Sequence, residues 1–210
     1  MEKFVRLKAI AAPVLRVNID TDVIIPSKEM KGVSKTGLSV GMFANWRYTD
    51  VAARVENPEF VLNREPYRKA QILLSGANFG CGSSREHAVW AMKEWGFRAV
   101  IAPSFGSIYY GNCVRNGILP VVLPDDVVQK IAAWVESNPA ANQVDIDLPS
   151  QKVHANGEAY SFSIGESDKD MLLEGLDPIG VTLKKDPAIQ AFEAKDRIAR
   201  PWVYINGPTS

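Results

Sequence analysis

The sequence has few cysteines, no excess charge of either sign and no long hydrophobic run. Only Cys81 and Cys113 occur among 210 residues, which is too few for a disulfide framework or for the thiolates of an iron–sulfur cluster. The 24 Lys and Arg residues equal the 24 Asp and Glu residues in number, so nothing favours binding to nucleic acid. No segment reaches the roughly 18 consecutive apolar residues of a transmembrane helix. These absences leave a globular protein without nucleic acid or membrane partners as the expectation.

The composition predicts one compact domain. Apolar residues make up 46% of the chain and charged residues 23%, which are ordinary values for globular proteins. We predict a single domain over 1–200 and a loosely attached tail over 201–210, where Gly207 and Pro208 occur. Charges and Pro13 interrupt the apolar residues of the N-terminal segment, unlike a secretory signal, so we expect a cytoplasmic protein.

The middle of the chain predicts a parallel β–loop–α–β unit. A buried strand over 71–75 leads through a glycine-rich loop into a helix, whose apolar residues at 88, 89, 91, 92 and 95 share one face. Gly96 is expected to end this helix, and a second strand follows over 98–102. Further strands are predicted over 4–10, 14–19, 118–123 and 143–148, a hairpin around Asn156–Gly157, and helices over 125–136 and 169–174 and from Asp186. The mixture is typical of an α/β protein.

The segment NFGCGSSREH, residues 78–87, is the most informative part of the sequence. It joins the strand to the helix, and unpaired amides at a helix N-terminus attract anions. Arg85 in the first helical turn would oppose the helix dipole, a conflict that an anionic ligand would remove. A structural alternative is a capping box, with Ser83 as N-cap and Glu86 at the third helical position. Helix capping and the anion site are compatible if Ser84 is the actual cap.

Three known signatures fail in this loop. Arg85 occupies the third glycine position of a dinucleotide fingerprint, the loop has no phosphate-binding lysine, and no G-x-S-x-G elbow is present. A Ser83–His87 pair is conceivable, but no acid is placed to orient the histidine.

A second candidate site is NIDTDVIIP, residues 18–26, with Asp20 and Asp22 before an apolar run. The following loop carries Lys28, Lys31 and Lys35, which could meet an acidic ligand. The alternative is a solvated charged loop with no ligand.

Together these motifs resemble the small-subunit family of 3-isopropylmalate dehydratases (isopropylmalate isomerases), relatives of the last domain of aconitase. The resemblance runs in order over nearly the whole chain, and NFGCGSSREHA followed by APSF is its most specific part. The matching segments are NIDTDVIIP at 18–26, NPEFVLN at 57–63, the run from Ile72 to Asn112, and GLDPIGVTL at 175–183.

The resemblance implies a swivelling β/β/α three-layer domain with a mixed sheet. It implies a large-subunit partner that carries a [4Fe–4S] cluster on three cysteines, and no cofactor or metal bound by this chain. The implied hydro-lyase reaction interconverts 2-isopropylmalate and 3-isopropylmalate through isopropylmaleate, in leucine biosynthesis. Related hydratases act on citraconate, maleate or dimethylmalate, and these substrates stay open. So does a non-catalytic anion-binding or assembly subunit.

The resemblance also implies roles for individual residues. Ser83 matches the family's catalytic base, and Ser84 and Arg85 match residues that hold a substrate carboxylate. Asp22 matches an active-site carboxylate. Lys35 and Thr36 lie in the loop Ser27–Leu38, where the family reads the third substituent of the hydroxy-dicarboxylate substrate. Gly82, Glu86 and His87 are expected to support these residues.

Overall fold

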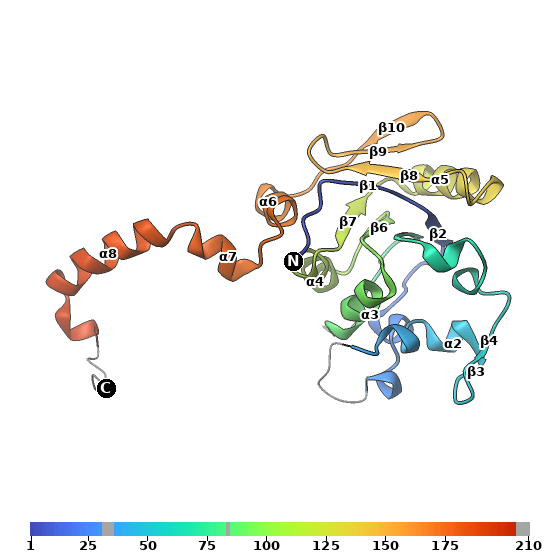
Figure 1. The fold of residues 1–210 in the computed structure, drawn as a ribbon, viewed down its shortest axis with the longest axis horizontal. Coiled ribbons are helices and arrows are strands. Elements are labelled where there is room, and N and C mark those ends of the chain that lie inside the picture. The colour runs from blue at the N-terminus through green and yellow to red at the C-terminus, as the bar shows by residue number, and fades with distance from the viewer. Residues whose placement is uncertain (31–35, 83–84, 205–210) are drawn as a thin grey trace.

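Two four-stranded sheets and a layer of helices build the body of the molecule (Figure 1). The computed structural model describes residues 1–30, 36–82 and 85–204. The first sheet is antiparallel, in the order β1-β8-β9-β10, and the second is parallel, in the order β2-β5-β6-β7. The strands are therefore divided between two sheets instead of sharing one mixed sheet. The antiparallel sheet consists of β1 (Arg6–Ala9), β8 (Val144–Asp147), β9 (Lys152–Ala155) and β10 (Glu158–Ser161).

The parallel sheet contains the predicted β–loop–α–β unit. Its strands are β2 (Ala11–Val14), β5 (Ile72–Ser75), β6 (Ala99–Ala102) and β7 (Leu119–Val122). Helix α3 (His87–Trp95) connects β5 to β6, and α4 (Ser107–Asn116) connects β6 to β7. Because these strands are short and covered on both sides, they are almost continuously apolar and buried. Pro120 lies in the edge strand β7, where a residue without a backbone N–H is tolerated.

The strand predicted over 14–19 is wrong. β2 ends at Val14, and the chain then turns away, with Asn18 in the left-handed conformation (φ 55°) and its amide donating to Ala77 O at 2.9 Å. The residues that were predicted as a strand belong to the loop that carries Asp20 and Asp22. Tertiary contact with the 76–82 loop therefore overrides local strand propensity here.

Short elements connect β2 to β5. They include a two-stranded sheet of β3 and β4, which lies apart from the two main sheets. In chain order they are α1 (Thr21–Ile24), η1 (Ser27–Glu29), η2 (Ser39–Gly41), α2 (Ala44–Arg47), β3 (Tyr48–Asp50), β4 (Val55–Glu56), η3 (Val61–Asn63) and η4 (Tyr67–Lys69).

Helix α5 (Asp125–Ser137) packs on β2, β5 and β6 and lies beside the antiparallel sheet (Figure 1). The N-cap of α5 is Pro124, and Asp125 and Asp126 both lie in its first turn. Helices α3 and α4 pack against each other, away from the antiparallel sheet. The predicted Asn156–Gly157 turn is confirmed, with φ values of 52° and 75°.

The C-terminal helices leave the body of the molecule. Helix α6 (Glu166–Glu174) ends at Gly175, whose carbonyl accepts from the Met1 ammonium at 2.6 Å. Beyond it, α7 (Pro178–Leu183), α8 (Asp186–Ala199) and η5 (Pro201–Val203) extend away from the sheets (Figure 1). We call these three elements the C-terminal arm. The division into a 1–200 domain and a 201–210 tail stays a prediction, and residues 205–210 lie outside the described part. No described helix is long and apolar enough to cross a membrane.

Candidate active site

Three loops meet at the carboxyl edge of the parallel sheet, where parallel strands commonly present ligand-binding residues. They follow β2, β5 and β6. The loop after β5 lies between the other two, because Asp20 bridges to Cys81 on one side and Phe79 bridges to Phe105 on the other. The amide of Gly80 donates to Ile19 O at 2.7 Å. Backbone hydrogen bonds thus hold all three loops in one arrangement.

Gly80 lies in the most crowded part of this loop. Its φ is +70°, and a Cβ there would overlap the ring of Tyr109, 2.7 Å from the Tyr109 Cβ. Tyr109 is 2% exposed and packs edge-on against Phe79. Only glycine fits both the backbone conformation and the space. Packing therefore explains the glycine at position 80 of the glycine-rich loop, independently of any ligand.

Two asparagines connect the first two loops. Asn78 Nδ2 donates to Asn18 Oδ1 at 2.8 Å, and both residues have left-handed backbones. The backbone amide of Asn78 also donates to Ser104 Oγ at 2.8 Å, in the third loop. Asparagine tolerates this conformation better than most residues, which accounts for its presence at both positions.

Asp22 and Arg85, both predicted site residues, are brought together. Asp20 caps α1 by accepting from the Val23 amide at 2.7 Å, which places Asp22 in the first turn of that helix. The Arg85 guanidinium forms an ion pair with the Asp22 carboxylate, from a position 63 residues away along the chain. Their side chains are 32% and 54% exposed, so the pair can reach a ligand from solvent.

The capping box, given above as the structural alternative, is wrong in its placement of Glu86 at the third helical position. Helix α3 begins at His87, and Glu86 is its N-cap position, with a helical backbone and no capping hydrogen bond. Glu86 instead accepts from Asn116 Nδ2 of α4 at 2.7 Å. Arg85 therefore precedes the helix and does not lie in its first turn. Because its charge is paired with Asp22, the conflict with the dipole is already relieved without a ligand.

Other predicted site residues are placed only in part. Ser83, Ser84 and Lys35, together with Lys31, lie outside the described residues. Gly82 has φ +91° and packs beside Asp20, where a Cβ would lie 3.4 Å from the Asp20 Cβ. His87 contacts the Trp90 ring at a centroid distance of 4.8 Å. Thr36 is exposed, and Lys28 is exposed in η1.

Sequence reasoning missed two residues that hold the end of the 27–38 loop. The Glu94 carboxylate, on α3, accepts from the amides of Gly37 (2.6 Å) and Ser39 (2.7 Å). Burial opposes ionisation of Glu94, but these backbone donors together outweigh it and lower its pKa. From the other side, Arg47 Nη1 donates to Ser39 O at 2.7 Å. No local sequence signal marks either residue, because both contacts are long-range or made to backbone atoms.

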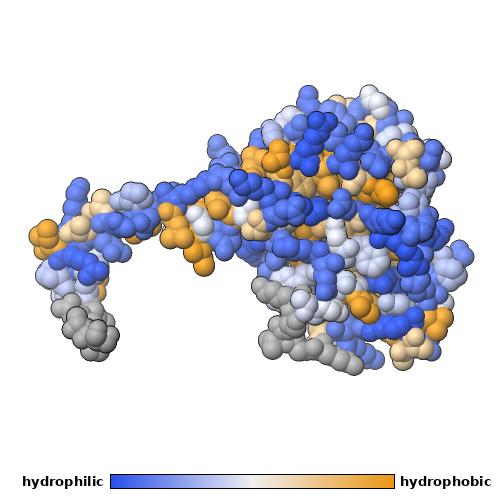
Figure 2. All heavy atoms as spheres, in the orientation of Figure 1, coloured by the Kyte–Doolittle hydropathy of each residue, from blue (hydrophilic) through white to orange (hydrophobic). Residues whose placement is uncertain are grey.

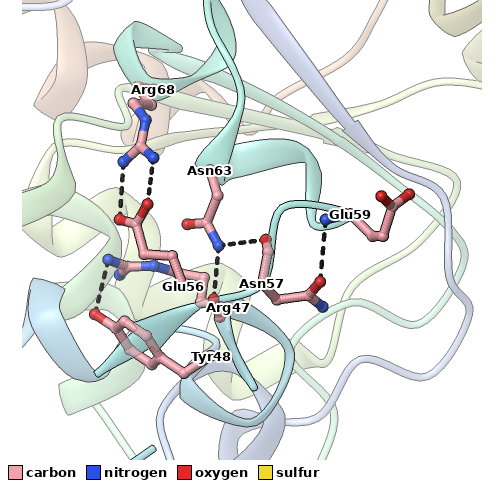
Figure 3. A network of polar contacts seen from close by, with 7 residues as sticks. All are labelled: Arg47, Tyr48, Glu56, Asn57, Glu59, Asn63 and Arg68. Atoms are coloured by element: carbon pink, nitrogen blue, oxygen red, sulfur yellow. Dashed lines mark hydrogen bonds and ion pairs between the residues drawn. The ribbon is translucent and has the colours of Figure 1, made fainter. Parts of the chain in front are cut away.

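Arg47 belongs to a polar network that explains the NPEFVLN segment (Figure 3). Asn63 Nδ2 donates to Arg47 O at 2.6 Å and to Asn57 O at 2.8 Å. The side chain of Arg47 is buried against the Trp95 ring, which lowers its pKa through desolvation. Arg68 forms a two-bonded ion pair with Glu56 nearby. The asparagines at both ends of the segment thus have structural roles.

The described residues contain no group of three or more His, Cys, Asp and Glu side chains that could hold a metal ion. Cys81 is partly exposed at the site, whereas Cys113 is buried in α4, and burial raises the pKa of its thiol. These two thiols do not fit an iron–sulfur cluster.

Comparison with known proteins agrees with this architecture. A family model described as the aconitase C-terminal domain matches residues 1–126. The solved structure of a 3-isopropylmalate dehydratase from Methanocaldococcus jannaschii superposes with a TM-score of 0.62 at 25% identity, covering 90% of this chain and 99% of that one. The fold and the loop site define an aconitase-type swivelling domain, which confirms the predicted fold class.

More specific matches identify the family. A 3-isopropylmalate dehydratase small subunit from Cupriavidus necator is 54% identical over 208 residues, covering 99% of this chain and all of the relative. One from Rhodospirillum centenum is 46% identical over 203 residues. A model described as the C-terminal domain of these small subunits matches residues 179–204. The chain belongs to the 3-isopropylmalate dehydratase small-subunit family, and it is part of a hydro-lyase, as the resemblance implied.

Proposed function

We propose that this chain supplies one half of an active site that it shares with a large dehydratase subunit. The complex interconverts 2-isopropylmalate and 3-isopropylmalate by dehydration and rehydration through isopropylmaleate. The observation that carries this proposal is the meeting of Asp22 and Arg85 beside the glycine-lined loop, in a chain of this family.

Ser83 is the proposed base. The proton to be removed is on a carbon next to a carboxylate and is weakly acidic, so the base must be strong. A serine hydroxyl ionises poorly at neutral pH, and fixed donors and helix-end charge in a closed site are the means of stabilising an alkoxide. Ser83 follows Gly82 and precedes α3 by a few residues, which supports this role.

Arg85 and Ser84 are the proposed carboxylate ligands. A guanidinium binds a carboxylate through two parallel hydrogen bonds, which orients as well as attracts the substrate. The Asp22–Arg85 pair is partly solvent-exposed, and such pairs contribute only about 0–1 kcal/mol. A substrate carboxylate can therefore replace Asp22 as the partner of the Arg85 guanidinium. Before substrate binds, the ion pair with Asp22 holds the guanidinium in position.

The large subunit is the proposed holder of the [4Fe–4S] cluster, because the donors of this chain do not fit one. When bound, the open iron of such a cluster supplies a Lewis acid for the departing hydroxyl. This chain contributes the proton transfer and the carboxylate contacts. We place the complex in the cytoplasm, where unpaired thiols remain reduced.

Lys35 and Thr36, together with the rest of the 27–38 loop, are proposed to contact the isopropyl substituent and so to select the substrate. Glu94 and Arg47 hold the far end of this loop, so the loop has a defined anchor on α3 and α2. Citraconate, maleate and dimethylmalate differ from isopropylmalate in the substituent that this loop would contact. Substrate choice is therefore tested separately from the chemistry.

The test is turnover of the complex reconstituted with its large subunit. We expect Ser83→Ala to reduce kcat by more than about 10³-fold with little change in KM, because the base is lost. Ser161→Ala, an exposed serine of β10, is the matched control and should retain full activity. Arg85→Lys should raise KM for isopropylmalate, since a point charge replaces a two-bonded contact.

Each result has a defined reading. Retained turnover in Ser83→Ala would reject the base assignment. Inactivity of the wild-type complex towards isopropylmalate, with activity towards citraconate or maleate, would reject the substrate and keep the chemistry. Inactivity towards all three, with both subunits bound, would favour a non-catalytic subunit.

A further inference from the structure

The C-terminal arm exposes an unusual amount of apolar surface. Of the 13 large hydrophobic side chains that are exposed among the described residues, seven lie within 178–203. Figure 2 shows apolar side chains at several places along the arm, which extends away from the body. The seven are Ile179, Leu183, Ile189, Phe192, Ile198, Trp202 and Val203.

The arm has little support from the rest of the chain. No residue of α7, α8 or η5 is buried, and α8 packs mainly against the η5 turn that follows it. Local contacts hold this end together: Tyr204 Oη donates to Asp196 Oδ2 at 2.9 Å, and Arg197 lies over the Tyr204 ring at 4.3 Å. An unsupported helix of 14 residues is only marginally stable in water. Its exposed apolar side chains therefore favour contact with a partner.

The comparisons indicate which partner this is. Residues 1–126, which hold the parallel sheet, match a family model named for a C-terminal domain, a part that is covalently joined to the rest of its protein. The arm matches a separate model named for the small subunit, and the Cupriavidus necator small subunit aligns over 99% of this chain. The arm thus accompanies the form of this domain that is a separate chain. A separate chain lacks the high effective concentration that a covalent linker gives.

We propose that the C-terminal arm is the noncovalent attachment of this chain to its large subunit, with the apolar side chains of α7, α8 and η5 seated in an apolar groove of that subunit. The inference rests on the proposed function for the existence of the partner. The arm contributes affinity and no catalytic residue. Residues 176–177 leave the body directly after Gly175. There the Met1 ammonium donates to Gly175 O and the Phe4 amide donates to Leu172 O, so the N-terminal segment holds the end of α6, from which the arm leaves.

The test compares two matched double variants of α8. Ile189→Ser with Phe192→Ser removes apolar side chains, and Gln190→Ser with Glu193→Ser places the same two serines about 100° further around the helix. The dissociation constant of each full-length chain for the large subunit is measured by biolayer interferometry. We expect the apolar double variant to weaken binding at least about 30-fold and the control less than about threefold.

An activity titration separates attachment from chemistry. At saturating large subunit, the apolar double variant should recover the wild-type kcat, with only the half-saturating concentration raised. Joining an arm-deleted chain to the large subunit by a flexible linker should restore activity at low concentration.

Several outcomes would overturn the inference. They are equal affinities for both double variants, a lowered kcat at saturation, and no rescue by the linker. Self-association of the small subunit that only the apolar variant abolishes, with unchanged affinity for the large subunit, would assign the arm to a second copy. If the wild-type chain does not bind the large subunit at all, the proposed function fails and this inference with it.

Discussion

Gly80→Ala tests whether packing at the carboxyl edge of the sheet is as tight as the structure shows. The new Cβ would overlap the Tyr109 ring, which cannot retreat because it is buried against Phe79. Overpacking of this kind costs about 1–3 kcal/mol, and a left-handed backbone costs an L-residue about 1–2 kcal/mol more. We expect a total loss of about 2–5 kcal/mol in the free energy of unfolding.

Gly157→Ala is the matched control for this prediction. Gly157 has φ +75°, close to the +70° of Gly80, but no heavy atom lies within 4 Å of the position that a Cβ would take there. Its substitution therefore carries only the backbone cost of about 1–2 kcal/mol. The difference between the two variants isolates the overlap with Tyr109.

Thermal unfolding of the isolated small subunit gives the measurement. For a chain of this length each kcal/mol shifts Tm by about 2–4 °C, so Gly80→Ala should melt roughly 10 °C below wild type and clearly below Gly157→Ala. Equal melting temperatures for the two variants would refute the reasoning. That result would mean that Tyr109 moves aside freely and that the 76–82 loop is not held as described.

Three further outcomes are expected. Glu94→Gln should raise KM roughly 3- to 10-fold with kcat nearly unchanged in steady-state assays, because the charged anchor of the loop end is weakened. Because folding lowers the pKa of Glu94, its carboxylate adds to the free energy of unfolding above the ordinary pKa of 4.5, and this stability is lost as the pH falls through the pKa of the folded state. In acid titrations, Glu94→Gln should therefore lose less stability than the wild type. Iodoacetamide at neutral pH should label Cys81 but not Cys113 in the native chain, and both after denaturation, as mass spectrometry would show; labelling of native Cys113 would contradict its burial and raised pKa.

The parts of the fold that were predictable are those with local causes. Helix α3 follows from apolar spacing and a glycine cap at Gly96, and the β9–β10 turn follows from Asn156–Gly157. In both cases the deciding residues are close in sequence. The prediction for the parallel unit was confirmed for the same reason.

The start of α3 was not predictable in this way. A capping box is a local pattern, but Arg85 pairs with Asp22 across 63 residues, and Glu86 pairs with Asn116 across 30. These tertiary partners engage both side chains, and the helix begins only after them. The anchor of the 27–38 loop was missed for a related reason, since Glu94 binds backbone amides 55 and 57 residues away.

In our proposals, the loop site supplies the geometry for catalysis and the C-terminal arm supplies the affinity for the large subunit. Backbone bonds join the three loops and an ion pair joins Asp22 to Arg85 within this chain alone, so ordering of these residues adds little cost to association. Among the described residues, the arm shares no substantial packing with those loops, and effects at sites without shared partners add. Loop substitutions should therefore change kcat or KM at saturating partner, arm substitutions should change only the half-saturating concentration, and a combined variant should show the product of the two effects. A combined effect well beyond that product would mean that docking of the arm helps to shape the site itself.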